Sequence, residues 1–349
     1  MKINLLTIWH EMNYGAELQA YATIKMLQEM GYRVQMIDIR LSDCRKLTFK
    51  GWIANIISSI GPGKQKFDRF WHRYIPVTKR YRSMESLQSD PPDGDVYLVG
   101  SDQVWNPDLT GNFAQLYYLD FGNDRVHRVS YASSFGTHKW TADSHTEKVK
   151  VLLQRFSHVS CRELSGVEIL RNTFGVDSLN VLDPTLLHDD YVELTGKIKQ
   201  RDTLVCYPLS KDPELLKYAH HLADQLGLCL INNNQTTNVL RKMIWNKVGI
   251  EEWIRSIAES KFVITRSFHG LAFSIIYKKN FAIIASENNR GTRIISLLSQ
   301  LGLQDRYYTN IQKCEDDEPW NHPIDYDKVY ESLNKMRTVS LDYLKKALQ

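Results

Sequence analysis

The sequence predicts an α/β protein with two doubly wound domains that face each other across a cleft. Short apolar runs with strand character alternate with longer segments whose apolar residues recur at helical spacing. Several strand-like runs end in polar turns marked by Gly or Pro, as expected at the carboxyl edge of a parallel sheet. The alternation starts again near Asp202, and 349 residues are enough for two domains that each bury a core.

The first domain, predicted at residues 1–195, opens with a β-α-β unit. Residues 3–8 form an apolar strand-like run, and residues 16–30 carry an apolar helical stripe that stops at Gly31. Residues 34–39 form the next strand-like run. A right-handed crossover makes these two strands parallel. The first turn lacks the G-x-G-x-x-G spacing, so no dinucleotide cofactor is expected.

Residues 41–92 interrupt this pattern and predict a basic helical insertion. Residues 52–60 and 67–74 have helical apolar spacing and are separated by a Gly-Pro-Gly break. Between Arg40 and Arg82 the chain carries eleven Lys or Arg against two acids, so the rest of the chain is negative overall. Either the aromatic faces cover the sheet and the basic faces are solvated, or the basic faces bind an anionic acceptor or a lipid surface.

Further strands and helices alternate through both domains. In the first domain, strands are expected at 95–99, 126–132, 158–161 and 179–182, and helices at 146–156 and 164–174. In the second domain, residues 196–325, strands are expected at 204–208, 229–231, 262–265 and 281–285, and helices at 213–226, 251–260, 271–277 and 292–301. Residues 326–349 form a helical tail. In each domain the turns after the strands meet at one edge of the sheet, where ligands bind.

Composition excludes several classes of protein. No run approaches the ~20 apolar residues that span a bilayer, and the first apolar run is too short for a signal peptide. A cytoplasmic protein is expected. The basic segment 40–82 leaves open a contact with the inner face of the membrane. The five cysteines are scattered without a C-x-x-C pair, and no metal-binding constellation is visible. The basic segment matches no nucleic-acid module, so no nucleic-acid partner is expected.

Residues 263–270 are the first candidate for the chemistry. An arginine, a hydroxyl, an aromatic ring, a histidine and a glycine stand between a strand-like run and a helix-like run. The free N–H groups and the dipole of a helix N-terminus attract anions. Arg266 adds a fixed charge, and His269 can exchange a proton near neutral pH. A phosphate or carboxylate ligand is expected; the alternative is that Arg266 caps the strand and His269 is a core histidine.

Seven short segments with polar, Gly-marked or Pro-marked ends occur in a fixed order along the chain. They are Asn13-Tyr14-Gly15-Ala16-Glu17-Leu18-Gln19-Ala20-Tyr21-Ala22, Val99-Gly100-Ser101-Asp102-Gln103-Val104-Trp105-Asn106, Tyr131-Ala132-Ser133-Ser134-Phe135-Gly136, Ser160-Cys161-Arg162-Glu163, Leu182-Asp183-Pro184-Thr185, Ser267-Phe268-His269-Gly270, and Arg293-Ile294 with Leu297-Leu298 and Leu301-Gly302-Leu303. Together, over about residues 1–306, they resemble the polysaccharide pyruvyl transferase family.

The resemblance implies a fold like that of the GT-B glycosyltransferases, with two Rossmann-like halves. It implies an enzyme that moves the enolpyruvyl group of phosphoenolpyruvate, as co-substrate without a separate cofactor, onto a sugar. The sugar is of galactose or mannose type, in a cell-surface polysaccharide or its lipid-linked oligosaccharide precursor, and the product is a pyruvate ketal. The phosphate and carboxylate of this donor require clustered cations, and arginine binds either group with two hydrogen bonds.

The resemblance also assigns donor-binding residues. The family's donor-binding arginine falls on Arg162, and its histidine before glycine falls on His269. Better-known members have Arg-Leu-His where this chain has Ser267-Phe268-His269. Arg266 lies one place earlier, and a one-residue shift after a strand turns a side chain to the opposite face, so the second anion contact is expected from Arg293 or Arg290 instead. The expected donor set is Arg162, Arg266, Ser267, Phe268 and Arg293.

Catalysis requires an acid for the enol methylene and a base for the sugar hydroxyl, together worth roughly 10²–10⁴-fold in rate. His269 is the expected acid. Asp102, at a strand end, is the expected base or acceptor-orienting carboxylate, with a helix N-cap as the alternative. The expected acceptor contacts are Asn13, Tyr14, Gly15, Ser101 and Gln103, with a tight β-α turn as the alternative for the first three.

Two other functions are compatible with the same pattern. A GT-B glycosyltransferase that uses a nucleotide sugar shares the two-domain cleft and the anion-binding helix end. A non-catalytic member that binds a sugar or a phosphate is the second alternative, since serine replaces the family arginine at residue 267.

Overall fold

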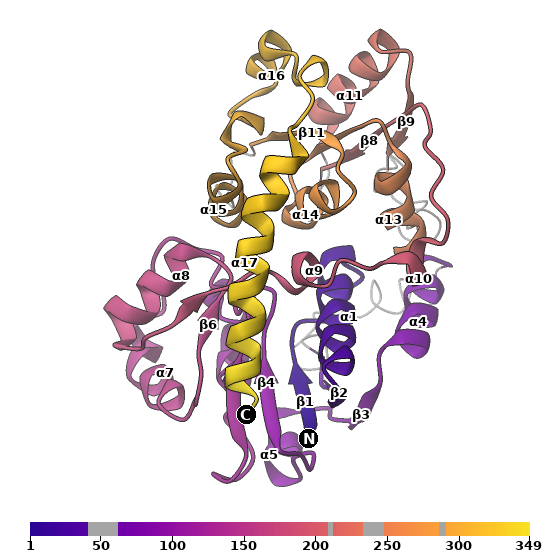
Figure 1. Ribbon diagram of the computed structural model, residues 1–349. Helices are drawn as coiled ribbons and strands as arrows, with labels where there is room; N and C mark the ends of the chain where they lie inside the picture. Colours follow the sequence, from indigo (N-terminus) through magenta and orange to yellow (C-terminus); the bar gives the residue numbers. More distant parts are fainter. Residues whose placement is uncertain (41–61, 209–211, 233–247, 286–290) are drawn as a thin grey trace, which may run out of the picture. The chain divides into compact units, whose positions relative to one another are not determined.

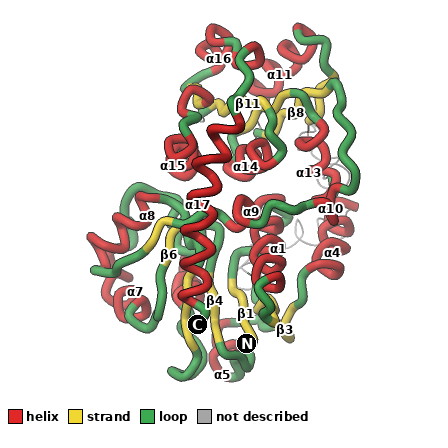
Figure 2. Tube along the Cα trace, viewed as in Figure 1, coloured by secondary structure: helices red, strands yellow, loops and turns green. Residues whose placement is uncertain are grey.

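The computed structural model describes residues 1–40, 62–208, 212–232, 248–285 and 291–349. Two compact units make up the chain. Within the described residues, unit 1 holds 1–40, 71–188 and 334–349, and unit 2 holds the remainder. In each unit the strands lie between helices on both faces of the sheet (Figure 2). The helical segment predicted at 52–60 lies outside the described residues.

Unit 1 is built on a parallel sheet with the strand order β3-β2-β1-β4-β5. Its strands are β1 (Lys2–Leu6), β2 (Arg33–Asp38), β3 (Val77–Arg80), β4 (Val96–Val99) and β5 (His127–Ser130). Parallel bridges from Val129 to His158 and from Ser133 to Cys161 continue the pairing to β6 (Ser160–Cys161), which pairs with β7 (Leu179–Asn180). The connections run outward from β1 and β4, so the boundary between these strands is the switch point at which such sheets bind ligands.

The helices of unit 1 begin at polar caps and bury apolar stripes. The first helix starts after Asn13, whose side chain accepts a hydrogen bond from the N–H of Gly15. On one face of the sheet, Val99 packs in a cluster with Trp105 and Leu152. The helices are α1 (Tyr14–Glu29), α5 (Met84–Ser89), α6 (Pro107–Thr110), α7 (Thr146–Leu153), α8 (Leu164–Ile169) and α9 (Pro184–Leu187).

Part of the predicted basic insertion is helical and part is not. The helix predicted at 67–74 is present in α4 (Pro62–Tyr74). The edge strand β3 follows it and was not predicted. The carbonyl of Pro76 accepts a hydrogen bond from the N–H of Met36 at 2.7 Å, which places the chain beside β2. A short, charged strand next to a proline is typical of a sheet edge, and pairing with β2 outweighs its weak local propensity.

Unit 2 contains a second parallel sheet, in the order β12-β11-β10-β8-β9. Its strands are β8 (Thr203–Tyr207), β9 (Cys229–Asn232), β10 (Phe262–Thr265), β11 (Asn280–Ile284) and β12 (Tyr307–Tyr308). Its helices are α10 (Val192–Thr195), α11 (Pro213–Gln225), α13 (Ile250–Glu259), α14 (Phe268–Ile276), α15 (Thr292–Leu301) and α16 (Ile311–Asp317). In its core Trp253 packs edge-on against Tyr207 and Phe273, with ring centroids 5.1 and 5.6 Å away. The predicted α/β class with two Rossmann-like sheets is confirmed.

The predicted C-terminal tail is one long helix, α17 (Tyr326–Ala347), drawn in yellow in Figure 1. Its first part belongs to unit 2, where the Tyr330 hydroxyl donates a hydrogen bond to the carbonyl of Ile276 at 3.0 Å. Its second part belongs to unit 1, where the Tyr343 hydroxyl donates to the carbonyl of Ser130 at 2.7 Å. Among the helices in the described ranges, none combines the length and the apolar character needed to cross a membrane.

Candidate active site

The loops at the carboxyl edge of the unit 1 sheet hold several non-glycine residues in left-handed backbone conformations. His10 and Met12 follow β1 with φ of 63° and 52°, Asp102 follows β4 with φ of 60°, and Ala132 follows β5 with φ of 52°. Such conformations cost roughly 1–3 kcal/mol each and persist only where the surrounding structure holds them. Because they gather at functional sites, this edge is the candidate site of unit 1.

Arg162 reaches the loop after β4 at this edge and is paired with carboxylates. It follows β6, and its side chain is 1% exposed. Its Nη1 donates hydrogen bonds to the Asp183 carboxylate and to the Ser101 hydroxyl, and its Nη2 lies 3.7 Å from Oδ1 of Asp102. Burial alone lowers the pKa of Arg162, but these carboxylates outweigh it and raise the pKa above its ordinary value. The guanidinium therefore stays charged and holds three loops together.

Asp183 joins this cluster although it is not among the predicted site residues. The Ser101 hydroxyl donates to its Oδ2 at 3.0 Å, and the N–H and hydroxyl of Thr185 donate to its Oδ1 at 2.9 and 2.6 Å. The carboxylate thus caps α9 and neutralises Arg162 at the same time. An Asp-Pro pair directly after a strand is the sequence feature that marks this position.

Gln19 is a second residue that was not predicted, and it joins the loops after β1 and β4. Its amide nitrogen donates to the Thr7 hydroxyl at 3.0 Å and to the Ile8 carbonyl at 3.1 Å. Its amide oxygen accepts a hydrogen bond from the N–H of Ser101 at 3.2 Å. An amide inside the buried stripe of α1 is the feature that could have identified it, because a buried polar group needs partners.

The predicted acceptor residues after β1 form the tight turn that was their alternative. The Asn13 side chain accepts a hydrogen bond from the N–H of Gly15 at 2.9 Å, and Tyr14 is buried. After β4, Asp102 is not a helix N-cap, because α6 is capped by Asn106. Oδ1 of Asp102 instead accepts a hydrogen bond from the N–H of the next residue at 2.8 Å, and its side chain is 15% exposed.

Gln103 is held by its neighbours at the same edge. Its amide oxygen accepts a hydrogen bond from the side chain of Asn106 at 2.8 Å. A Cβ at Gly136 would lie 2.1 Å from that oxygen, and Gly136 has a φ of 66°, so only glycine fits there. The loop after β5 is therefore shaped to accept Gln103.

The second group of predicted residues lies at the carboxyl edge of the unit 2 sheet. Ser267 caps α14, and its hydroxyl accepts a hydrogen bond from the N–H of Gly270 at 3.3 Å. A Cβ at Gly270 would lie 2.4 Å from the hydroxyl of Thr265, so glycine lets the helix approach the strand end. His269 stands in the first turn of α14 and is 7% exposed.

Two helices begin side by side at this edge. Helices α14 and α15 both lack an acidic residue in the first turn. Arg293, in the first turn of α15, places its guanidinium 5.8 Å from the ring centroid of Phe268 in α14. The hydroxyl of Thr292, which was not predicted, is buried and has no hydrogen-bond partner among the described residues. Such an edge attracts an anion through helix N–H groups and arginine.

Arg266 forms an ion pair within unit 2. Its Nη1 lies 2.5 Å from Oδ2 of Asp212, and both side chains are largely buried. Asp212 also caps α11. Arg266 therefore anchors the strand end to a neighbouring loop, which was the alternative that the sequence left open. Arg290 lies outside the described residues.

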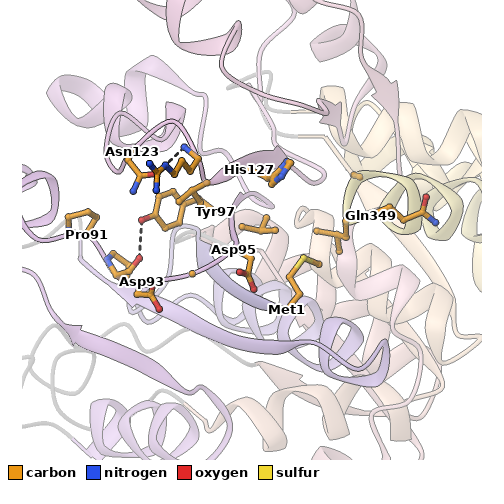
Figure 3. A pocket seen from close by; sticks show the side chains of 15 residues that line it. Met1, Pro91, Asp93, Asp95, Tyr97, Asn123, His127 and Gln349 are labelled. Carbon is orange, nitrogen blue, oxygen red and sulfur yellow. Dashed lines mark hydrogen bonds between the residues drawn. The ribbon is translucent and has the colours of Figure 1, made fainter.

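A cavity of about 750 Å³ lies at the opposite edge of the unit 1 sheet (Figure 3). It is lined by residues at the beginnings of β1, β4 and β5, among them Met1, Asp95 and His127, and by Gln349. It contains none of the predicted site residues. Across the ranges that the structure describes, no group of three or more His, Cys, Asp or Glu is placed to hold a metal ion.

Solved structures with a similar fold include an epimerase and a glucosyltransferase. A UDP-GlcNAc 2-epimerase from Methanocaldococcus jannaschii matches with a TM-score of 0.54 and 10% identity, over 93% of each chain. Glycyrrhiza uralensis UGT73P12 matches with a TM-score of 0.52 and 9% identity, over 99% of this chain and 94% of that chain. An alpha-glucosyltransferase in complex with UDP matches with a TM-score of 0.50 and 7% identity, over 98% and 96%. These likenesses confirm the predicted GT-B-like fold and carry no statement about substrate.

Sequence comparison identifies the family. No curated protein matches the chain significantly. The family model described as polysaccharide pyruvyl transferase matches residues 13–288, well over half of the chain. The matched range includes the motifs on both candidate edges except Arg293 and the residues after it. The chain therefore belongs to the polysaccharide pyruvyl transferase family.

Proposed function

We propose that this protein is a ketal pyruvyltransferase. It transfers the enolpyruvyl group of phosphoenolpyruvate onto a galactose- or mannose-type sugar of a cell-surface polysaccharide or its lipid-linked precursor. Family membership supports the reaction class. The observation that carries the donor assignment is the unit 2 edge, where α14 and α15 have no acidic residue in the first turn and the Arg293 guanidinium lies 5.8 Å from the ring centroid of Phe268.

The donor is assigned mainly to unit 2. The N–H groups at the start of α14 and the side chain of Arg293 bind its phosphate and carboxylate. Ser267 and Phe268 line the same edge and complete the contact. Arg162 and Arg266 stay in the proposed donor set, and each also contacts an aspartate of its own unit.

The chemistry divides between an acid and a base. His269 protonates the methylene carbon of the donor, which makes the adjacent carbon electrophilic. A sugar hydroxyl attacks that carbon, and Asp102 accepts the hydroxyl proton. The C–O bond to phosphate then breaks and phosphate leaves. A second hydroxyl of the same sugar adds to the carbon and closes the ketal, and its proton passes to His269, which regenerates the acid. Asn13, Tyr14, Gly15, Ser101 and Gln103 are assigned to the acceptor.

A nucleotide-sugar glycosyltransferase is the second candidate, because paired helix N-termini bind a diphosphate as readily as a phosphate. The deciding experiment supplies phosphoenolpyruvate with galactosides or mannosides, free or lipid-linked, and measures acceptor-dependent release of phosphate. Release supports the proposal. Thermal stabilisation by UDP-sugars together with no release from phosphoenolpyruvate would overturn it, and stabilisation by phosphoenolpyruvate without turnover would indicate a non-catalytic member.

The basic segment 40–82 is the basis for proposing where in the cell the reaction takes place. Arg69 and Arg73 are exposed on one side of α4, one helical turn apart. We propose that the enzyme works in the cytoplasm and meets a lipid-linked acceptor at the inner face of the membrane through this segment. Flotation with vesicles of anionic lipid tests this, and loss of flotation in an R69E/R73E variant is the expected result.

A further inference from the structure

The loop after β1 carries a stack of aromatic rings. The ring of His10 stacks on that of Trp71, with centroids 3.4 Å apart and planes 24° apart. Trp9 meets both rings edge-on, with centroids 5.4 and 6.2 Å away. Trp71 is buried, whereas His10 keeps part of its exposure. The left-handed backbone of His10 directs its side chain onto Trp71 at a conformational cost.

Glu17 fixes the position of Trp71 in this stack by a hydrogen bond. Its Oε2 accepts a hydrogen bond from Nε1 of Trp71 at 2.5 Å, and its Oε1 accepts one from the N–H of Glu11 at 3.2 Å. The carboxyl is fully buried, and burial raises its pKa to about 8. A buried acid that is bonded to both the indole and the loop leaves Trp71 little freedom to turn. The stack is therefore preorganised within unit 1.

A sugar ring fits this surface chemically. A pyranose presents a face of C–H groups, which packs well on an aromatic ring, while its hydroxyl groups point sideways to polar partners. The stack follows β1, and the loop with Asp102 follows the neighbouring β4 at the switch point of the sheet. Gln19 bonds these two loops together. Ring and carboxylate thus occupy adjacent loops of one edge.

We propose that the His10–Trp71 stack is the platform on which the sugar ring of the acceptor packs, and that Glu17 is the residue that positions it. The assignment rests on the proposed pyruvyltransferase function. It adds a binding role to two residues for which the sequence suggested none, and it assigns the acceptor to unit 1.

Kinetics of three variants test the platform. His10→Ala removes the ring, His10→Phe keeps a ring, and His72→Ala changes an exposed histidine next to Trp71 as a matched control. We expect His10→Ala to raise the acceptor KM about tenfold with the phosphoenolpyruvate KM unchanged. His10→Phe restores most of the acceptor affinity, and His72→Ala behaves as the wild type. An unchanged acceptor KM in His10→Ala, or a His10→Phe variant as impaired as His10→Ala, overturns the proposal.

Direct binding separates this proposal from the proposed function. Tryptophan fluorescence is followed while methyl β-galactoside or methyl α-mannoside is added to the wild type and to His10→Ala. A saturable change in the wild type that is lost in His10→Ala supports the platform even if the enzyme transfers no pyruvyl group. Glu17→Gln, which keeps the shape of the side chain, is expected to weaken this binding without abolishing it. No saturable change in the wild type with either sugar overturns the platform.

Discussion

The carboxyl edges of the two sheets differ in charge. At the unit 1 edge Arg162 faces the carboxylates of Asp102, Asp183 and Glu163. At the unit 2 edge Arg266 is balanced by Asp212, and Arg293 stands in the first turn of a helix without acids. The two halves share a topology but not an electrostatic character. The comparison teaches that an anionic donor suits unit 2 and a neutral, hydroxyl-rich acceptor suits unit 1.

Glu163 also occupies backbone donors at the unit 1 edge. One oxygen of Glu163 accepts hydrogen bonds from the N–H groups of Phe135 and Gly136 at 2.7 and 3.1 Å. Backbone donors that would otherwise serve an incoming phosphate are therefore used internally. In unit 2 the first turns of α14 and α15 hold no acidic residue, so no carboxylate within them competes with an anionic ligand.

The largest expected effect is on turnover, at His269. Replacing His269 by Gln removes the proposed acid while keeping a side chain that forms hydrogen bonds. We expect kcat to fall about 10²–10⁴-fold with little change in the dissociation constant of phosphoenolpyruvate. Phosphate release and calorimetric binding measure the two quantities. Asp102→Asn serves as the matched change on unit 1, and it should lower kcat without affecting donor binding. A fully active His269→Gln enzyme would contradict the assignment.

The next effect is on stability, at Arg162. Replacing Arg162 by Ala leaves the buried carboxylate of Asp183 without its counter-ion. Breaking such a pair costs about 3–5 kcal/mol, so we expect a marked fall in the free energy of unfolding. Denaturant unfolding followed by circular dichroism measures it, and Arg162→Lys should recover part of the loss because it keeps the charge.

The Arg162 experiment can also contradict the assignment of the donor to unit 2 and of the acceptor to unit 1. If the Ala variant keeps its stability but loses affinity for phosphoenolpyruvate, Arg162 acts on the donor, as the family resemblance implies. The acidic edge would then contribute to anion binding, and the division between the two units would have to be abandoned.

Much of the fold was accessible from local patterns. Apolar runs and helical stripes predicted the strands and helices that flank both candidate edges, such as β10 and α14, because burial on a sheet face imposes those periods. The edge strand β3 was missed because its residues are charged and it is defined by pairing with β2. Local spacing carries no information about such a partner.

The candidate site was accessible only in part. The motifs identified Arg162 and Ser267, yet the partners that decide their roles come from elsewhere in the chain. Asp183 is 21 residues from Arg162, and the contact depends on two loops whose backbone conformations no spacing rule predicts. The same holds for His10 and Trp71, which are brought together by the packing of α4. The local signs were a polar residue in an apolar stripe, as at Gln19, and the Asp-Pro pair that begins at Asp183.

A third prediction concerns the protonation state of Glu17 and therefore the charge of unit 1. Its pKa of about 8 in the folded protein exceeds the ordinary value of 4.5. Between these two values the unfolded chain releases a proton that the folded protein keeps, so stability falls as pH rises through this window. The loss is on the order of a few kcal/mol. Glu17→Gln lacks this term, so the stability of the wild type relative to the variant should decrease from pH 5 to pH 8.

Urea unfolding of both proteins at pH 5, 6, 7 and 8 checks this dependence. A stability difference that stays constant over the series would mean that Glu17 is ionised in the folded protein. Unit 1 would then carry the negative charge of Glu17 in addition to those of Asp102, Asp183 and Glu163, which would make it still less suited to the donor.

The smallest effect concerns the two arginines of unit 2. Replacing Arg293 by Ala removes a charged hydrogen-bond donor worth about 1.5–3 kcal/mol, so we expect phosphoenolpyruvate to bind roughly tenfold to a hundredfold more weakly. Replacing Arg266 by Ala should matter less for binding and more for stability, because Arg266 already contacts Asp212 at 2.5 Å. Calorimetry with phosphoenolpyruvate and thermal melts of both variants separate the two outcomes. If Arg266→Ala instead weakens binding more than Arg293→Ala, the donor lies against the strand end after β10, and Asp212 must release its arginine when the donor binds.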